Sequence, residues 1–245
     1  IRRLVRKVML QCDHIQCDAQ FVKEKIKRDY AVDDSKVTVF PWGIDLSLFK
    51  TADKNESRAQ CNLPIAKFIV IFNRSLESVY GVNDLLEGFK RFSENKDDVM
   101  LLILASGSQK ESVVRYIQKN NLTAKVRMMD RITNSLLPAY LNSSDVYIST
   151  ALSDGTSLAM LEALACGLPL IVTDVPAIRE WVSDSNGIIV PLQSPGKVCE
   201  ALEKYYGNRK LMEEHGEINM KVAKERADWD INYLKLKEIY NKMTA

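Results

Sequence analysis

The sequence predicts a doubly wound parallel α/β domain with a Rossmann-like sheet and a helical C-terminal tail. Short β-branched runs alternate with longer segments of helical period between residues 37 and 190. Two of these runs, FIVIF and MLLILA, are apolar throughout, which is typical of strands buried on both faces of a parallel sheet. The alternation of strand and helix favours about six strands joined by right-handed crossovers.

The expected elements follow in chain order. Residues 1 to about 31 predict a helix, a short strand at 14–17 and a second, Lys-rich helix, and the PWGID segment at 41–45 predicts a turn. Apolar and β-branched runs predict strands at 37–40, 68–73, 100–105, 126–129, 146–150, 169–173 and 187–190. Amphipathic periodicity predicts helices at 82–94, 110–121, 135–142, 157–166 and 176–183, and an almost wholly helical tail at 195–243.

Composition excludes several classes of protein. Hydrophobic residues make up 46% of the 245 residues and charged residues 27%, so the chain is an ordinary globular protein. The 34 Lys and Arg residues nearly balance the 32 Asp and Glu residues, so no nucleic-acid partner is expected. The five cysteines form no C-x-x-C pair, which favours free thiols and a cytoplasmic location. They are Cys12, Cys17, Cys61, Cys166 and Cys199.

Common catalytic motifs are missing from the sequence. No two glycines form G-x-G, no G-K-[ST] occurs, and there is no G-x-S-x-G elbow, so the dinucleotide fingerprint, the P-loop and the hydrolase elbow are excluded. Only two histidines occur, His14 and His215, which argues against a histidine metal site or a Ser-His-Asp triad. No metal is therefore expected.

The loop after the strand at 146–150 carries the features of a ligand site. It contains Asp154 and Gly155, and Thr156 or Ser157 is a suitable N-cap for the next helix. In an open α/β sheet, the N–H groups of residues 155–158 (Gly155, Thr156, Ser157 and Leu158) would face the crevice at the carboxyl ends of the strands and suit a diphosphate. The alternative is a capped amphipathic helix with no ligand.

Two charged residues strengthen the case for a nucleotide. Glu162 lies about five residues into that helix, roughly 7 Å along its axis, where a carboxylate can accept hydrogen bonds from ribose hydroxyls. Arg74 follows the FIVIF strand and would face the same crevice, where a guanidinium suits phosphate oxygens. The alternative for Arg74 is a surface ion pair with Glu77.

The segment from Asp154 to Glu162 resembles the Glu-x7-Glu motif of the family 4 retaining glycosyltransferases of the GT-B fold, with Asp at the first position. The LEALACGLPLIVTD stretch that ends the motif is also similar to that family. Further landmarks follow in the family's order: VTVFPWGID, FNRSLESVYGVNDLLEGF, LLILASG, SNGIIVPL, and a terminal helix with Trp229 and Tyr240. The resemblance covers essentially the whole chain.

The resemblance implies the C-terminal, donor-binding half of a two-domain GT-B enzyme in glycan or glycolipid synthesis. Residues 1–40 would be the closing elements of the N-terminal, acceptor-side domain, 41–228 the nucleotide-sugar-binding domain, and 229–245 a helix returning towards the N-terminal domain. The partners would be a nucleotide sugar, the missing N-terminal domain and a glycan or lipid-linked acceptor. Transfer with retention would need both domains and no metal or other cofactor, so this chain alone would be inactive.

By position in the motif, Asp154 would contact the transferred sugar, Glu162 the ribose and Arg74 the diphosphate. The loop of Asp130, Arg131 and Ile132 would lie against the base. Two positions depart from the family: Tyr80 lies where a second phosphate-binding Lys is common, and Asp130 replaces a familiar Gly.

Two other functions stay open: a non-catalytic module that binds nucleotide sugars, favoured by the missing Lys, and a sugar-nucleotide epimerase, disfavoured by the scarcity of His. The basic start of the chain also has two interpretations. It is either the solvated face of an ordinary helix or a peripheral contact with anionic lipid at the inner face of the membrane. Its cations are Arg2, Arg3, Arg6 and Lys7.

Overall fold

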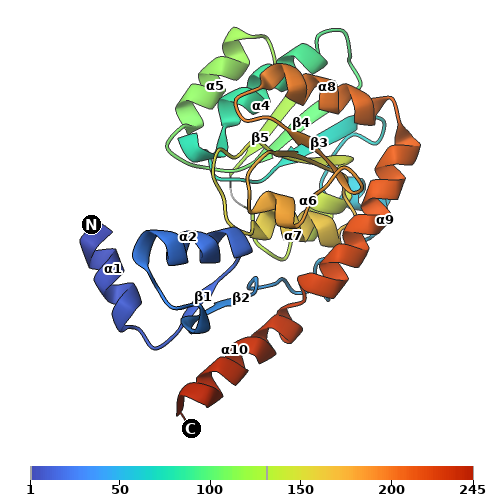
Figure 1. The fold of residues 1–245 in the computed structure, drawn as a ribbon. Coiled ribbons are helices and arrows are strands. Elements are labelled where there is room, and N and C mark those ends of the chain that lie inside the picture. The colour runs from blue at the N-terminus through green and yellow to red at the C-terminus, as the bar shows by residue number, and fades with distance from the viewer. Residues whose placement is uncertain (1, 131, 245) are drawn as a thin grey trace.

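A six-stranded parallel sheet forms the centre of the computed structural model, which describes residues 2–130 and 132–244 (Figure 1). The strand order is β5-β4-β3-β6-β7-β8, and every neighbouring pair is parallel. The strands are β3 (Phe68–Phe72), β4 (Val99–Leu104), β5 (Val126–Met129), β6 (Val146–Ser149), β7 (Leu170–Thr173) and β8 (Gly187–Val190). The chain winds outward in both directions from β3 and β6, so the predicted doubly wound sheet is confirmed and its switch point lies between these two strands.

Helices cover both faces of this sheet (Figure 1). On β3, Ile69 and Ile71 join one buried cluster while Val70 and Phe72 join the other, as the two-residue period of a strand requires. One face carries α4 (Val82–Phe92), α5 (Lys110–Lys119) and α8 (Pro195–Tyr206). The other carries α6 (Leu137–Asn142) and α7 (Leu158–Ala165), with α9 (Arg209–Arg226) packed against α7.

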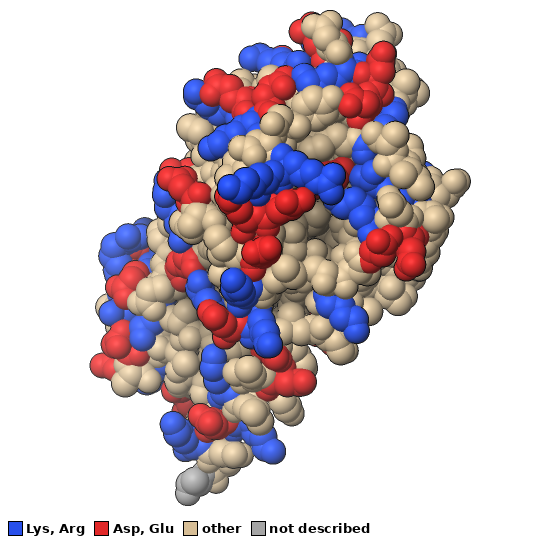
Figure 2. Space-filling view, turned by 90° about the vertical axis from the view of Figure 1, so that its right-hand side faces the viewer, with Lys and Arg blue, Asp and Glu red and all other residues tan. Residues whose placement is uncertain are grey.

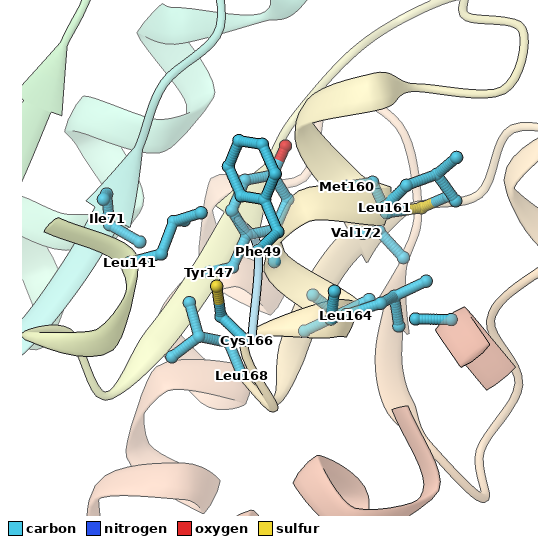
Figure 3. Close-up of a cluster of buried hydrophobic side chains, with 14 of the residues drawn as sticks. Phe49, Ile71, Leu141, Tyr147, Met160, Leu161, Leu164, Cys166, Leu168 and Val172 are labelled. Atoms are coloured by element: carbon cyan, nitrogen blue, oxygen red, sulfur yellow. The ribbon is translucent and has the colours of Figure 1, made fainter. Parts of the chain in front are cut away.

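The cluster beneath α7 fixes the helix that begins at the predicted site. Met160, Leu161 and Leu164 are fully buried and share the cluster with Tyr147 of β6 and with Phe49, as Figure 3 shows. Burying each such side chain contributes about 1.5–3 kcal/mol. The start of α7 is therefore held rigidly over the carboxyl end of β6.

A second, two-stranded parallel sheet lies apart from the first. It pairs β1 (Ile15–Cys17) with β2 (Val37–Val39) and packs with α2 (Gln20–Tyr30), in agreement with the expected helix, strand, helix and strand of this region. The remaining elements of this segment are α1 (Arg2–Gln11) and the 3₁₀ turn η1 (Asp34–Lys36).

The segment after β2 runs beside the junction of α9 and α10 (Trp229–Thr244). The Ile44 N–H donates to the Ala227 carbonyl at 2.8 Å, and the Trp229 N–H donates to the Ile44 carbonyl at 3.0 Å. This short parallel bridge directs α10 towards the side of the molecule where β1 and β2 lie (Figure 1).

One predicted element of secondary structure is wrong, and one helix is present that was not predicted from the sequence. The expected helix at 176–183 is only the 3₁₀ turn η3 (Ile178–Glu180), because the side-chain oxygen of Asn186 accepts the Ser183 N–H that a continuing helix would use. The helix α3 (Lys54–Gln60) was not expected, although Asp53 caps it by accepting the Glu56 N–H at 2.9 Å. The Asp53-x-x-Glu56 spacing is the sequence signal for that cap.

Charges of both signs mingle over the face shown in Figure 2, without an extended patch of one sign. In the part of the chain that the structure describes, no helix is both long and apolar enough to cross a bilayer.

Candidate functional site

Arg74 lies at the carboxyl end of β3 and reaches the loop that follows the neighbouring strand, β6. Its Nη2 donates to Asp154 Oδ2 at 2.8 Å, and its Nη1 donates to Ser157 Oγ at 2.5 Å. The alternative pairing with Glu77 is not formed, since that carboxylate accepts from the backbone and hydroxyl of Ser108. Parallel strands bring both loops to one edge, so two segments 80 residues apart share a single site.

Tyr80 packs its ring against the Arg74 guanidinium, with 4.3 Å from the guanidinium carbon to the ring centroid. It ends the 3₁₀ turn η2 (Ser78–Tyr80) and is followed by Gly81 at φ +61°. A Cβ on Gly81 would lie 2.1 Å from the Thr150 carbonyl oxygen, so only glycine fits there. The Thr150 hydroxyl lies 3.1 Å from the Tyr80 carbonyl and 3.0 Å from that of Gly81, which fixes Tyr80 beside the site.

Ser157 caps α7, as expected, because its hydroxyl oxygen accepts the Met160 N–H at 3.3 Å. Two of the four N–H groups expected to face a ligand already have partners. The Gly155 N–H donates to Asp154 Oδ1 at 3.1 Å, and the Thr156 N–H donates to Asp18 Oδ2 at 3.0 Å. The expectation of four free N–H groups is therefore wrong for these two.

Asp18 reaches this loop from the end of β1. Its backbone carbonyl accepts the Thr156 hydroxyl at 2.5 Å, and the Trp181 indole N–H donates to the same hydroxyl oxygen at 3.2 Å. A Cβ on Gly155 would lie 2.5 Å from Asp18 Oδ2, so the small residue permits this close approach. Sequence reasoning missed Asp18, since no local pattern links residues 138 positions apart.

Glu162 lines a cavity of about 610 Å³ next to the start of α7. Leu158 and Glu162 form one wall, and the loop at 43–49, Asn134 and residues 228–230 form the rest. Burial raises the pKa of the Glu162 carboxyl to about 7, and the Arg74 charge opposes that rise. Glu162 thus exists as a mixture of acid and carboxylate near neutral pH.

Burial also raises the pKa of the Asp154 carboxyl, against the lowering effect of Arg74. The fully buried Tyr147 on β6 is a second residue that sequence reasoning missed. Burial raises the pKa of its hydroxyl, with Arg74 lowering it and Asp154 and Glu162 raising it further. The Tyr147 hydroxyl therefore lies within the electrostatic range of all three charged groups and stays protonated.

The loop expected to meet the base follows β5. Asp130 is exposed and pairs with Lys110 Nζ at 2.5 Å, whereas Ile132 packs against the buried cluster beneath α7. Arg131 lies outside the described residues. Neither described side chain of this loop lies among the residues that line the cavity at Glu162.

A second cavity, of about 680 Å³, lies at the opposite, amino ends of the strands. Its Arg58 is buried and donates to the Ser143 carbonyl at 2.9 Å and to Asp145 at 2.7 Å, so its charge is already neutralised. Ligands of open parallel sheets bind at the carboxyl ends, which favours the cavity at Glu162. Among the described residues, no group of three or more His, Cys, Asp and Glu could hold a metal ion.

Curated glycosyltransferases are similar in sequence to this chain. A D-inositol 3-phosphate glycosyltransferase of Paenarthrobacter aurescens is 25% identical over 200 residues, covering 80% of this chain and 49% of that protein. A phosphatidyl-myo-inositol mannosyltransferase of Mycobacterium leprae is 24% identical over 183 residues, covering 74% of this chain and 48% of that protein. The chain spans about half the length of these curated relatives.

Solved structures share the fold. Sucrose-phosphate synthase of Thermosynechococcus elongatus superposes with a TM-score of 0.88 at 18% identity, covering 99% of this chain and 61% of that one. The Anabaena protein HepE, solved in complex with UDP-glucose, superposes with a TM-score of 0.87 at 16% identity. The match covers 98% of this chain and 67% of that one. The model of the family described as "Glycosyl transferases group 1" matches residues 53–222, more than half of the chain. The predicted family is thereby confirmed: the chain belongs to the group 1 glycosyltransferases.

Proposed function

We propose that the edge formed by β3, β6 and α7 binds the nucleotide-sugar donor of a glycosyltransferase that transfers the sugar with retention. The observation that carries this proposal is the meeting of Arg74 with the capped start of α7, at Ser157. A fixed cation beside a helix N-terminus is suited to a diphosphate. HepE, with its UDP and UDP-glucose complexes, supports the same ligand class here.

Each part of the donor has a place in this proposal. The diphosphate binds Arg74 and the amides at the start of α7, and the ribose hydroxyls bind Glu162. The nucleoside occupies the cavity of about 610 Å³ that Glu162 lines, and the base extends beyond that cavity if it meets the loop of Asp130 and Ile132. Asp154 faces the transferred sugar, and Tyr80 orients Arg74 by stacking rather than supplying a second charge.

Catalysis then rests on stabilising the charge that develops on the leaving diphosphate. A front-face displacement lets that diphosphate take the proton of the attacking acceptor hydroxyl, so Arg74 and the α7 amides perform the main electrostatic work. This scheme assigns no step to a metal. The relatives named as a D-inositol 3-phosphate glycosyltransferase and a phosphatidyl-myo-inositol mannosyltransferase support a hydroxyl on a phosphorylated or lipid-linked acceptor.

The acceptor side is assigned to a further domain. The chain spans about half of its curated relatives, and its β1–β2 sheet has only two parallel strands, which cannot form a core alone. In this proposal residues 1–40 complete an N-terminal domain, residues 41–228 bind the donor, and residues 229–245 return to the N-terminal domain. The chain alone then binds a donor and transfers nothing.

A non-catalytic binding module is the second candidate, because Asp154 already neutralises Arg74, the cation in the described part of the site. The epimerase alternative has no such support. His14 bonds to Thr38 at 2.9 Å, and His215 bonds to Tyr205 at 2.7 Å, which places neither imidazole at the Arg74 site.

Calorimetry of this chain with UDP, GDP, ADP and their glucose and mannose esters tests the proposal. One nucleoside diphosphate should bind, its nucleoside should bind more weakly, and its sugar ester should bind at least as well as the diphosphate. The absence of binding to all of them at millimolar concentration would refute a donor site. Transfer by the chain alone would refute the assignment of the acceptor to another domain.

A further inference from the structure

The carboxylate of Asp18 binds the loop that leads into α7. Asp18 Oδ2 accepts the Thr156 N–H at 3.0 Å, and a Cβ on Gly155 would lie only 2.5 Å from the same oxygen. The Thr156 amide is one of those that the proposed function gives to the diphosphate. A protein carboxylate and a phosphate oxygen therefore compete for one donor.

A second contact joins the segment of Asp18 to η3, the turn that follows β7. Glu180 accepts the Gln20 N–H at 2.9 Å and the Phe21 N–H at 2.8 Å, at the first turn of α2. The N-cap residue of α2, Ala19, supplies no side-chain cap, so Glu180 satisfies amides that would otherwise lack a partner. The docking of this segment thus has an anchor that does not involve Thr156.

The hydroxyl of Thr156 also holds the segment without the carboxylate of Asp18. It donates to the Asp18 backbone carbonyl at 2.5 Å and accepts from the Trp181 indole at 3.2 Å. Neither contact depends on the charge of the Asp18 side chain. The charge can consequently be removed while the contact between the two segments remains.

The Asp18 carboxylate lies among other charged groups of the loop and repels an anionic ligand. Asp18 and Asp154 both lie at the loop, and Asp18 helps to raise the pKa of the Asp154 carboxyl, so the two charges act on each other. Arg74 is already paired with Asp154, and Glu162 is partly ionised near pH 7. A diphosphate arriving here meets like charge on the side of Asp18.

We propose that Asp18 sets the affinity of this site for phosphate, because a diphosphate can take the Thr156 amide only by displacing the Asp18 carboxylate. The inference rests on the proposed donor site. It adds a residue from beyond the six-stranded sheet as a determinant of how tightly the donor's diphosphate is held, while the nucleoside is unaffected.

Two substitutions at Asp18 separate this role from a structural one. Asp18→Asn keeps an oxygen that can accept the Thr156 N–H but removes the charge, and Asp18→Ala removes both. We expect the dissociation constant for UDP, GDP or ADP, whichever binds, to fall about five-fold in Asp18→Asn and further in Asp18→Ala. The dissociation constant for the matching nucleoside should stay unchanged in both variants.

Two control variants remove a charge without freeing the Thr156 amide. Asp13→Asn and Glu24→Gln each alter an exposed residue of the same segment. Both should bind the diphosphate as the parent chain does. Calorimetry with each nucleoside diphosphate, the nucleoside and inorganic pyrophosphate gives the comparison, and circular dichroism melts show that the variants are folded.

The outcomes distinguish this inference from the proposed function. If the parent chain binds a diphosphate and both Asp18 variants bind it equally or more weakly, the role of Asp18 is overturned and the donor site stands. A parallel loss of nucleoside and diphosphate would mean that Asp18 only supports the loop, which also overturns it. Binding that appears only in the Asp18 variants supports it, whereas no binding by any variant overturns the donor site and the inference together.

Discussion

Arg74 and Asp154 form an ion pair 2.8 Å long across the carboxyl ends of two neighbouring strands, with side-chain exposures of 11% and 14%. The residue proposed to hold the diphosphate is thus bonded to the residue proposed to face the sugar. Because both groups are largely withdrawn from water, their attraction is screened less than that of a surface pair. Any ligand that takes Arg74 must share it with Asp154 or replace Asp154.

The first prediction concerns Arg74. Arg74→Ala should weaken binding of the nucleoside diphosphate by about 1.5–3 kcal/mol, the scale of a hydrogen bond to a charged group, and should leave the nucleoside nearly unaffected. Titration calorimetry with both ligands measures the difference. Arg179→Ala, which breaks an exposed pair with Asp174, is the matched control and should change neither affinity. Equal losses for nucleoside and diphosphate would show that Arg74 is not the phosphate anchor.

The second prediction concerns Asp154, the ion-pair partner of Arg74. Asp154→Asn removes the charge that neutralises Arg74, so affinity for the diphosphate should be kept or improved. The additional affinity contributed by the hexose should fall, because the carboxylate proposed to face it is gone. The affinity of Asp154→Asn for the nucleotide sugar, compared with its affinity for the nucleoside diphosphate, isolates the contribution of the hexose. Asp174→Asn is the control. A sugar increment that survives intact would remove Asp154 from the hexose site.

The third prediction concerns the pH dependence of stability through Glu162. Its folded pKa of about 7 lies above the ordinary value of 4.5, so its contribution is fully present below pH 4.5 and is lost as the pH rises through 7. Glu162→Gln should therefore match the parent chain near pH 4.5 and exceed it at pH 8. The gain should be on the order of 2 kcal/mol in the free energy of unfolding, reduced from the full shift by the partial exposure of the group.

Urea unfolding at several pH values measures this difference, with the exposed Glu225→Gln as control. The same substitution should weaken nucleoside and diphosphate alike, because the ribose is common to both. In the parent chain, nucleoside affinity should rise between pH 6 and 8 as the carboxylate forms. A constant stability difference across this range would mean that Glu162 does not titrate as its burial indicates.

Much of the fold follows from local sequence. The runs FIVIF and MLLILA are buried on both faces in β3 and β4, and an apolar strand of that kind has few other stable placements. The Ser157 cap was predictable as well, because Ser before an apolar helix is a local signal. Parallel order then brings Arg74 to the loop after β6 without any further information.

What could not be predicted depends on partners distant in the sequence. Nothing near Asp18 indicates that it would bind the Thr156 amide, and nothing near Glu180 indicates that it would cap α2. The turn at η3 is a different case, because the contact that interrupts its helical pattern is local: Asn186 lies three residues after Ser183. Local propensity is overridden where a side chain from elsewhere satisfies the backbone.

The last prediction concerns Gly81, which holds Tyr80 against Arg74 by its backbone alone. Gly81→Ala must place a Cβ at φ +61° and within 2.1 Å of the Thr150 carbonyl oxygen, so both the conformation and the contact are unfavourable. The chain should lose about 2–4 kcal/mol of unfolding free energy. Gly196→Ala, at the start of α8, is the matched control. Its Cβ would lie 3.6 Å from Arg91 Nη1, and the substitution should be neutral or stabilising by about 0.5 kcal/mol.

Gly81→Ala should also weaken the binding of the diphosphate. Moving residue 81 away from Thr150 shifts the Tyr80 ring, and the Arg74 guanidinium loses the surface against which it stacks. Diphosphate affinity should then fall by about 0.5–1 kcal/mol, the scale of an exposed cation–π contact, while nucleoside affinity holds. Tyr80→Phe keeps the ring and should bind normally, whereas Tyr80→Ala should reproduce the ligand defect of Gly81→Ala with a smaller loss of stability, since Tyr80 is only partly buried. If Tyr80→Ala binds the diphosphate as the parent chain does, the ring does not orient Arg74, and the geometry of the turn serves the fold alone.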